Sequence, residues 1–305
     1  MRAVIAVLPV RAGRLPAGAD AAVAACAGRA LVIGEQPRVA AGSLRAELSE
    51  LRVCEAGPFA PSRWAAGLAP LLAGAGPVVL PGSPDGRDLL GRLAASLGWP
   101  AFAWCTEVTG SSVTTTRHDG RASVRVPVGA PFVATLVPTA GRGHPRASGG
   151  LGSITVADVP LAEHDVREAE VVDVTDADPA EIDLAEADRI VAGGVGLGGE
   201  DGFAALRRVA DGLRASLGAT RPIADRGIVG HERQIGTTGA AVDPTLYLVF
   251  GISGAVQHTA GLGTPERVVA VNTDPACPMM AMADLAVVAD ARATVEALAA
   301  RLGRP

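Results

Sequence analysis

Short runs of apolar residues, separated by polar turns, recur along the first part of the chain. The runs AVIAVLPV at 3–10, RALVIGE at 29–35 and GPVVLPG at 76–82 have the length and composition of buried strands. Over 87–97 the leucines recur at helical spacing instead, which predicts a helix. Strands and helices that alternate in this way predict an α/β domain.

Runs rich in β-branched residues follow, with turn signals between them. The segments AFAWC, SSVTTTRHDG, ASVRVPV and FVATLVP lie between 101 and 138, and a hairpin-like His118-Asp119-Gly120 ends the second of them. These runs predict an antiparallel addition to the α/β domain. The Gly-rich stretch 139–152 predicts a loop, and the acidic stretch 160–188 predicts a strand followed by a solvated connection.

A more regular alternation of strands and helices begins near residue 188. The expected strands are DRIVAGG, PIADRG, TLYLVFG, RVVAVN and LAVVAD, and the expected helices are 201–217, SGAVQHTAG and 293–302. This order predicts a doubly wound parallel sheet, in which ligands bind beyond the carboxyl ends of the strands. Those ends carry Gly194, Gly251, Asn272 and Asp290. We therefore expect two domains, 1–185 and 186–305.

Composition and charge argue against several classes of protein. The 305 residues are 49% hydrophobic, and the formal net charge is −5 without an Arg-rich block, so binding to nucleic acid is not expected. The four cysteines form no Cys-x-x-Cys pair, which argues against a zinc site or a redox dithiol. No stretch reaches the ~18 apolar residues of a membrane-spanning helix, and the first apolar run is too short for a signal sequence. We expect a cytoplasmic protein without membrane insertion.

Three segments of the second half have residues suited to a polar ligand. GGVGLGG at 193–199 allows a phosphate to approach backbone N–H groups, but tight packing of a strand on a helix is the favoured explanation of its glycines. In GATRPIAD, Arg221 suits either the end of a helix or a planar anionic ligand. RQIGTTG has two glycines that a turn would explain, and paired threonines, Thr237 and Thr238, that a turn does not require.

The segment GISGAVQH has an unusual residue pattern for a helix that follows a buried strand. Ser253 is suited to be the N-cap, and Gly254 and His258 are four residues apart, so they share one face. The small glycine leaves room for a flat ligand below the imidazole. The helix N-terminus disfavours a protonated histidine unless a bound ligand becomes anionic. A buried histidine satisfied by the core is the alternative.

These segments together resemble the FAD domain of the electron transfer flavoprotein α subunit. ADRIVAGGVGLGGEDGF, LGATRPIADRGIV, QIGTTG, TLYLVFGISGAVQH, RVVAVNTDPACPMMAMAD and VVAD occur in that family's order and near its spacing, over about 186–300. PVVLPGSPDGRDLLGRLAASLGWP is similar, more faintly, to the family's amino-terminal domain. The resemblance implies FAD contacts from Thr220, Arg221, Ile235, Gly236, Thr237, Thr238, Ser253, Gly254, Ala255, Val256, Gln257, His258, Asn272 and Asp290.

The resemblance also implies a role for several of these residues. Arg221 would lie by the isoalloxazine, Thr238 would donate near N5, and His258 would face the C2 carbonyl, so these three would tune the redox potential. Ser253 and its neighbours would hold the pyrophosphate or ribityl part. Asn272 and Asp290 would serve the adenosine end. The protein would be an electron carrier and not an enzyme that converts a substrate.

The partners follow from the same resemblance. They are an electron transfer flavoprotein β subunit in a heterodimer, a flavin or other dehydrogenase as electron donor, and a quinone reductase or other acceptor downstream. Three positions depart from the family's pattern: Val195 stands where Arg is usual, GTTGA replaces GQTGK, and Thr273 replaces Lys in NKDP. They raise the hypothesis of a divergent actinobacterial-type member with a dedicated dehydrogenase of the mycofactocin-associated kind.

Two other functions remain open at this point. A nicotinamide-dependent dehydrogenase would use the glycines of 194–199 with Asp225 at the ribose, but the chain has no lysine and one tyrosine, Tyr247, for a catalytic set. A cofactor-free regulatory paralogue would explain Val195 and the altered threonine loop.

Overall fold

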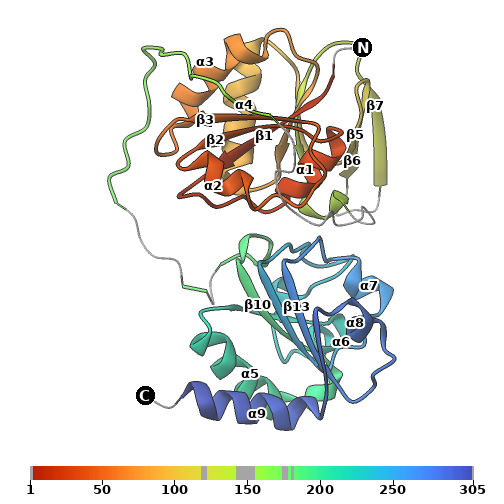
Figure 1. Cartoon of the computed structure of the whole chain (residues 1–305). Coiled ribbons are helices and arrows are strands. Elements are labelled where there is room, and N and C mark those ends of the chain that lie inside the picture. The colour runs from red at the N-terminus through yellow and green to blue at the C-terminus, as the bar shows by residue number, and fades with distance from the viewer. Residues whose placement is uncertain (1–2, 118–121, 142–154, 174–177, 180–181, 304–305) are drawn as a thin grey trace. The chain divides into compact units, whose positions relative to one another are not determined.

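The structure is a computed structural model that describes residues 3–117, 122–141, 155–173, 178–179 and 182–303. It divides into two compact units, Met1–Val174 and Thr175–Pro305 (Figure 1). The expected turn His118-Asp119-Gly120 and most of the expected loop 139–152 lie outside the described residues. The functional boundary expected at 185/186 stays a prediction.

The first unit is built on a nine-stranded sheet with helices on both faces. Its strand order is β7-β6-β5-β8-β4-β1-β2-β3-β9. The strands are β1 (Ile5–Val10), β2 (Arg29–Gly34), β3 (Glu50–Glu55), β4 (Val78–Pro81), β5 (Ala101–Val108), β6 (Ser112–Arg117), β7 (Ala122–Pro127), β8 (Val133–Leu136) and β9 (Val156–Asp158). The helices are α1 (Ala19–Ala25), α2 (Pro37–Ala41), α3 (Pro61–Leu72) and α4 (Pro84–Leu97), with a short 3₁₀ turn at Pro138–Gly141.

Side chains that alternate along β1 divide between two cores. Leu8 faces α1 and α2, whereas Val7 faces α3 and α4. This is the alternation expected of a strand buried on both faces. Helix α4 begins at Ser83, whose hydroxyl accepts a hydrogen bond from the N–H of Gly86 at 3.2 Å. The expected strands and helix are therefore confirmed in this part of the unit.

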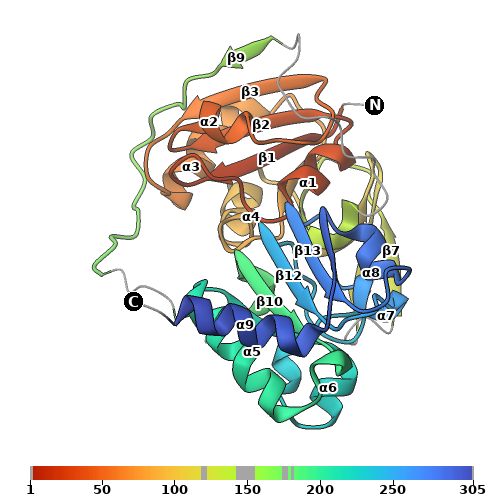
Figure 2. The same cartoon turned by 60° about the horizontal axis from the view of Figure 1, so that its bottom comes forward.

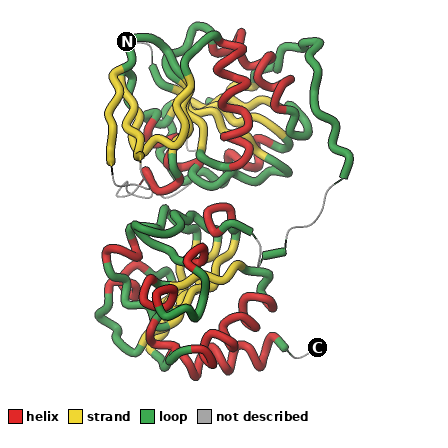
Figure 3. The backbone as a smooth tube through the Cα atoms, turned by 180° about the vertical axis from the view of Figure 1, so that it is seen from behind, coloured by secondary structure: helices red, strands yellow, loops and turns green. Residues whose placement is uncertain are grey.

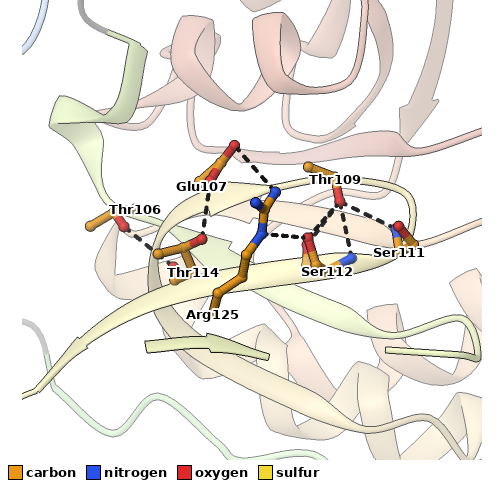
Figure 4. Close-up of polar contacts among 7 residues, drawn as sticks. All are labelled: Thr106, Glu107, Thr109, Ser111, Ser112, Thr114 and Arg125. Atoms are coloured by element: carbon orange, nitrogen blue, oxygen red, sulfur yellow. Dashed lines mark hydrogen bonds and ion pairs between the residues drawn. The ribbon is translucent and has the colours of Figure 1, made fainter. Parts of the chain in front are cut away.

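The expected antiparallel addition consists of β5, β6 and β7. β6 pairs antiparallel with both of its neighbours, whereas β5 runs parallel to β8. A network of exposed polar side chains crosses the three strands (Figure 4). In it Arg125 donates to the hydroxyl of Ser112 at 3.3 Å, and Thr114 donates to Glu107 at 3.0 Å. Cross-strand pairs of this kind fix the register of an exposed hairpin.

The second unit is a five-stranded parallel sheet of order β11-β10-β12-β13-β14. Its strands are β10 (Arg189–Gly193), β11 (Ser216–Ala219), β12 (Leu246–Phe250), β13 (Arg267–Asn272) and β14 (Leu285–Val288). Its helices are α5 (Glu200–Gly212), α6 (Arg221–Asp225), α7 (Val256–Thr259), α8 (Pro278–Met282) and α9 (Ala291–Leu302), with 3₁₀ turns at Leu184–Glu186, Val195–Leu197 and His231–Arg233. Helices α5 and α9 lie side by side against one face of the sheet (Figure 2). Helix α8 and the segments 235–245 and 251–262, on either side of β12 in the sequence, pack on the other face. The expected fold class is therefore confirmed, and Figure 3 shows the strands and helices of both units.

Three local expectations were wrong. The helix expected over 201–217 ends at Gly212, and the next strand is Ser216–Ala219, because Arg214 turns the chain at φ +50°. The expected strand PIADRG is instead α6, since Pro222 stands in the first turn, where proline favours a helix start. The strand expected in 160–188 is absent from the described part of that stretch, where Val172 is 92% exposed and packs on no partner.

Two further features concern the membrane and the cysteines. Among the described helices, none has the length and apolar character needed to cross a membrane. The four cysteines are buried free thiols.

Candidate functional site

The second unit has a cavity where the direction of strand order reverses. From β10 the chain moves to β11 on one side, and then returns to β12, β13 and β14 on the other. Open parallel sheets bind ligands beyond the carboxyl ends of strands at such a switch point. A cavity of about 610 Å³ lies there. It is lined by Gly194, Val195, Gly196, Thr220, Arg221, Pro222, Gln234, Ile235, Gly236, Thr237, Thr238, Gly251, Ile252, Ser253, Gly254, Ala255, Gln257, His258 and Asn272.

Two glycine-containing loops form one wall of this cavity by direct backbone packing. A Cβ on Gly194 would lie 2.3 Å from the carbonyl oxygen of Gly251, and one on Gly196 would lie 2.8 Å from its Cα. The N–H of Gly194 donates to the carbonyl of Phe250 at 3.0 Å. Gly194 and Gly196 therefore pack closely on the loop at Gly251, and both line the cavity. The packing of a strand on a helix favoured from the sequence applies to Gly193, where a Cβ would lie 2.6 Å from Phe203 and 2.8 Å from Leu206 of α5.

The loop 234–239 forms a polar part of the cavity wall. Gly236 has φ +147°, and a Cβ there would lie 2.6 Å from the carbonyl oxygen of Gln257. That carbonyl accepts from the N–H of Thr237 at 2.8 Å. Buried Gln234 donates from Nε2 to the hydroxyl oxygen of Thr238 at 2.9 Å. The Thr238 hydroxyl therefore already accepts one bond, which leaves its own proton to donate.

Thr220 and Arg221 come from the junction of β11 and α6. Arg221 lies in the first turn of α6, its side chain is 65% exposed, and its Nε is 3.3 Å from Oδ2 of Asp225. Asp225 therefore pairs with this guanidinium. The buried hydroxyl oxygen of Thr220 has no hydrogen-bond partner in the described part of the chain. An orphaned polar atom in a cavity wall is the kind of group that a bound polar ligand satisfies.

His258 is buried in this wall at 6% exposure. Its Nε2 is 2.8 Å from the hydroxyl of Tyr247, and its Nδ1 is 3.1 Å from the carbonyl oxygen of Ile235. Burial lowers the pKa of His258 to about 4, although the bond to Ile235 opposes the shift. The imidazole is therefore neutral near pH 7.

The helix that carries His258 is shorter than expected. It spans Val256–Thr259, and Ala255 is its N-cap, without a side-chain cap bond. The prediction that Ser253 caps it was wrong, because Gly254 at φ +83° turns the chain before the helix begins. The carbonyl of Ser253 instead accepts from the N–H of Met279 at 3.1 Å.

Most of the residues expected from the sequence lie together around this cavity, and two do not. Val256 is 78% exposed, and Asp290 instead caps α9 by accepting from the N–H of Ala293 at 2.7 Å. Asn272 donates from Nδ2 to the carbonyl of Ile252 at 3.1 Å and so joins two lining loops. Seven further lining residues were not among the contacts implied by the resemblance: Gly194, Val195, Gly196, Pro222, Gln234, Gly251 and Ile252. Gln234 lies within the segment RQIGTTG, which was the available signal.

The cavity fits a flat polar ligand such as a flavin on its own geometry. Backbone glycines keep one wall bare, the Thr220 hydroxyl is unsatisfied, and the Thr238 hydroxyl has a proton to donate. One guanidinium, that of Arg221, belongs to the lining set.

Comparisons with known proteins agree with this geometry. Residues 183–263 match the electron transfer flavoprotein FAD-binding domain, and residues 18–164 match the electron transfer flavoprotein domain. The electron transfer flavoprotein subunit alpha of Mycobacterium tuberculosis is 37% identical over 242 residues, which cover 78% of this chain and 76% of that protein. The corresponding subunit of Syntrophomonas wolfei is 36% identical over 223 residues, 72% of this chain and 69% of that one.

A protein named FixB is also similar. That of Rhizobium meliloti is 35% identical over 220 residues, 70% of this chain, and the match spans 62% of the FixB protein, which is less than two thirds of its length. The two family matches and the two α subunits nevertheless each cover large parts of this chain, 78% of it for the subunit of Mycobacterium tuberculosis. The chain belongs to the electron transfer flavoprotein α-subunit family, and its second unit contains that family's FAD-binding domain.

Proposed function

We propose that this chain is the α subunit of a heterodimeric electron transfer flavoprotein, which takes electrons from a dehydrogenase and passes them to a downstream acceptor. The observation that carries the proposal is the switch-point cavity, because most of the residues expected to contact FAD line it, and nearly all of these lie in the region 183–263 that matches an FAD-binding domain. FAD supplies the redox chemistry when it is bound. A β subunit, a dedicated dehydrogenase donor and a quinone reductase or other acceptor are the partners that this proposal includes.

The residues of the chain would bind FAD and set its electrostatic surroundings. The glycine wall would lie against the cofactor, and the hydroxyls of Thr220 and Thr238 would donate or accept hydrogen bonds at its polar edges. Arg221 would place positive charge beside the ring. A charge-assisted hydrogen bond contributes ~1.5–3 kcal/mol. In a one-electron couple, where 59 mV is a tenfold change, that corresponds to roughly 60–130 mV.

Two of the residues expected to contact FAD lie outside the cavity. Asp290 and Val256 do not line the cavity, so their contacts with FAD would require a ligand that extends past it along α9 or α7. An adenosine end that reaches the start of α9 would meet Asp290 there.

The test is a redox titration of the chain co-expressed with its β subunit. We expect bound FAD, transfer of its electrons to an added one-electron dye, and a first-electron potential that falls by roughly 60–130 mV in Arg221→Gln. Arg226→Gln is the matched control, since Arg226 is the C-cap of the same short helix and lies outside the lining set. Equal potentials in the two variants would refute the role of Arg221, and a complex without FAD would refute the function.

A further inference from the structure

Tyr247 is a fully buried tyrosine whose hydroxyl has one partner in the described structure. It lies on β12 at 0% exposure, and its hydroxyl is 2.8 Å from Nε2 of His258. The two rings lie nearly parallel, 24° apart, with centroids 6.3 Å from each other. Tyr247 does not line the cavity, whereas His258 does.

The hydrogen-bond partners of His258 determine where its proton lies. A backbone carbonyl only accepts, so the carbonyl of Ile235 requires a hydrogen on Nδ1. In a neutral ring Nε2 is then unprotonated, and it accepts the hydroxyl proton of Tyr247. A charged ring would donate from both nitrogens, and the buried hydroxyl proton of Tyr247 would lose its acceptor. The neutral ring with the hydrogen on Nδ1 is the form that satisfies every group.

Among the residues that the structure describes, none places a negative charge beside His258 that would favour its protonation. Cys277 lies just before α8 in the same buried cluster as Tyr247, and Arg221 in α6 lines the same cavity as His258. In the part of the chain that is described, no carboxylate pairs with the ring, whose two nitrogens bond Tyr247 and Ile235. Burial acts in the same direction and lowers its pKa. The ring therefore has no free N–H to offer a ligand in the cavity.

We propose that Tyr247 is a positioning residue of this site, whose buried hydroxyl holds His258 in its neutral form. The proposal rests on the proposed function and changes one part of the expected chemistry. Positive charge in the cavity then comes from Arg221, and His258 is a neutral wall of the flavin site. Tyr247 acts through His258 and needs no contact with the cofactor.

The first experiment measures the protonation of His258 by ¹⁵N NMR of the FAD-free chain. The resonances of His258 are assigned by their loss in His258→Gln. We expect Nδ1 to be protonated and Nε2 unprotonated in the wild type, without titration above pH 5.5, a value above the native pKa of about 4. In Tyr247→Phe the neutral ring loses a hydrogen bond, so the pKa of His258 rises above its native value of about 4, while burial still holds it below the ordinary 6.5.

Val249→Ala is the matched control for lost packing. Val249 is buried on the same strand and belongs to the same core cluster as Tyr247, but it makes no hydrogen bond through its side chain. We expect the pKa of His258 to remain low in this variant. The proposal is overturned if His258 of the wild type titrates near 6.5, or if Tyr247→Phe and Val249→Ala leave it equally low.

A second experiment uses the FAD-loaded heterodimer and separates this proposal from the function on which it rests. In Tyr247→Phe we expect the first-electron potential of the flavin to rise as the pH falls from 7 to 5.5, because the imidazole of His258 now becomes protonated beside the flavin ring. The rise should be steeper than in the wild type or in Val249→Ala. Parallel potentials in the three proteins contradict the proposal. A heterodimer that binds no FAD contradicts the function, and the NMR result on the FAD-free chain still decides the role of Tyr247.

Discussion

The buried imidazole of His258 should make the second unit lose stability as the pH falls. Its native pKa of about 4 lies below the ordinary 6.5, which we take for the unfolded chain. Between these values the unfolded chain binds more protons than the native one, so stability increases with pH across the interval. The contribution is present above 6.5 and is lost as the pH falls through 6.5 toward 4. From pH 7 to pH 5 the loss is about 2 kcal/mol for these two pKa values.

The assay must report on the second unit alone. The three tryptophans are Trp64, Trp99 and Trp104, all in the first unit, so their fluorescence does not follow the second. Hydrogen exchange of the amides of β10 and β12, corrected for intrinsic rates, gives the opening free energy of the second unit directly.

The comparison that isolates His258 is a difference between variants. Other groups also titrate between pH 7 and pH 5, but they do so equally in the wild type and in His258→Gln. We expect the wild type to lose about 2 kcal/mol more than this variant over that interval. The control His231→Gln, at an exposed position, should keep the wild-type profile. Parallel profiles for wild type and His258→Gln would show that the imidazole is not held neutral, and the reasoning would fail.

Substitutions at three positions test other residues of the expected set. Thr220→Val removes a buried hydroxyl without a partner in the described structure, so the free energy of unfolding of the FAD-free chain should rise by up to about 1 kcal/mol in thermal unfolding. FAD affinity should fall roughly tenfold. A loss of stability would show that the hydroxyl is satisfied. Gly236→Ala places a Cβ 2.6 Å from the carbonyl oxygen of Gln257 at φ +147°, and should cost ~1–3 kcal/mol by urea unfolding; wild-type stability would contradict the described turn. Asp290→Ala should lower the free energy of unfolding by about 1 kcal/mol, because α9 loses its N-cap, whereas Asp290→Asn should keep the cap. Weaker FAD binding in the Asn variant would therefore reveal a contact with the cofactor, and unchanged binding would argue against one.

The strands of the second unit were predictable because buried parallel strands are nearly continuous apolar runs. DRIVAGG, TLYLVFG, RVVAVN and LAVVAD each contain a strand of the structure. The segment between α5 and α6 was not predictable in the same way. Arg214 adopts φ +50°, a conformation that its side chain does not signal, and the short strand that follows contains Ser216 and Gly218.

The lining residues were identified largely through the resemblance, while their protonation and pairing required the structure. The spacing of Gly254 and His258 indicated a histidine beside open space, and that histidine does line the cavity. Its partners are distant in sequence, since Tyr247 and Ile235 come from a strand and a loop before it. No periodicity of the sequence links such residues. The alternative stated from the sequence, a buried histidine whose ring is hydrogen-bonded within the core, describes how both ring nitrogens are paired.

The most direct test of this account is the FAD content of the chain purified together with its β subunit. The account predicts a yellow heterodimer that releases about one FAD per α chain on denaturation. It also predicts weaker FAD binding in Gly194→Val, because a Cβ there would lie 2.3 Å from the carbonyl oxygen of Gly251 and would force apart the two loops that form the glycine wall. A colourless, folded heterodimer that takes up no added FAD would contradict it.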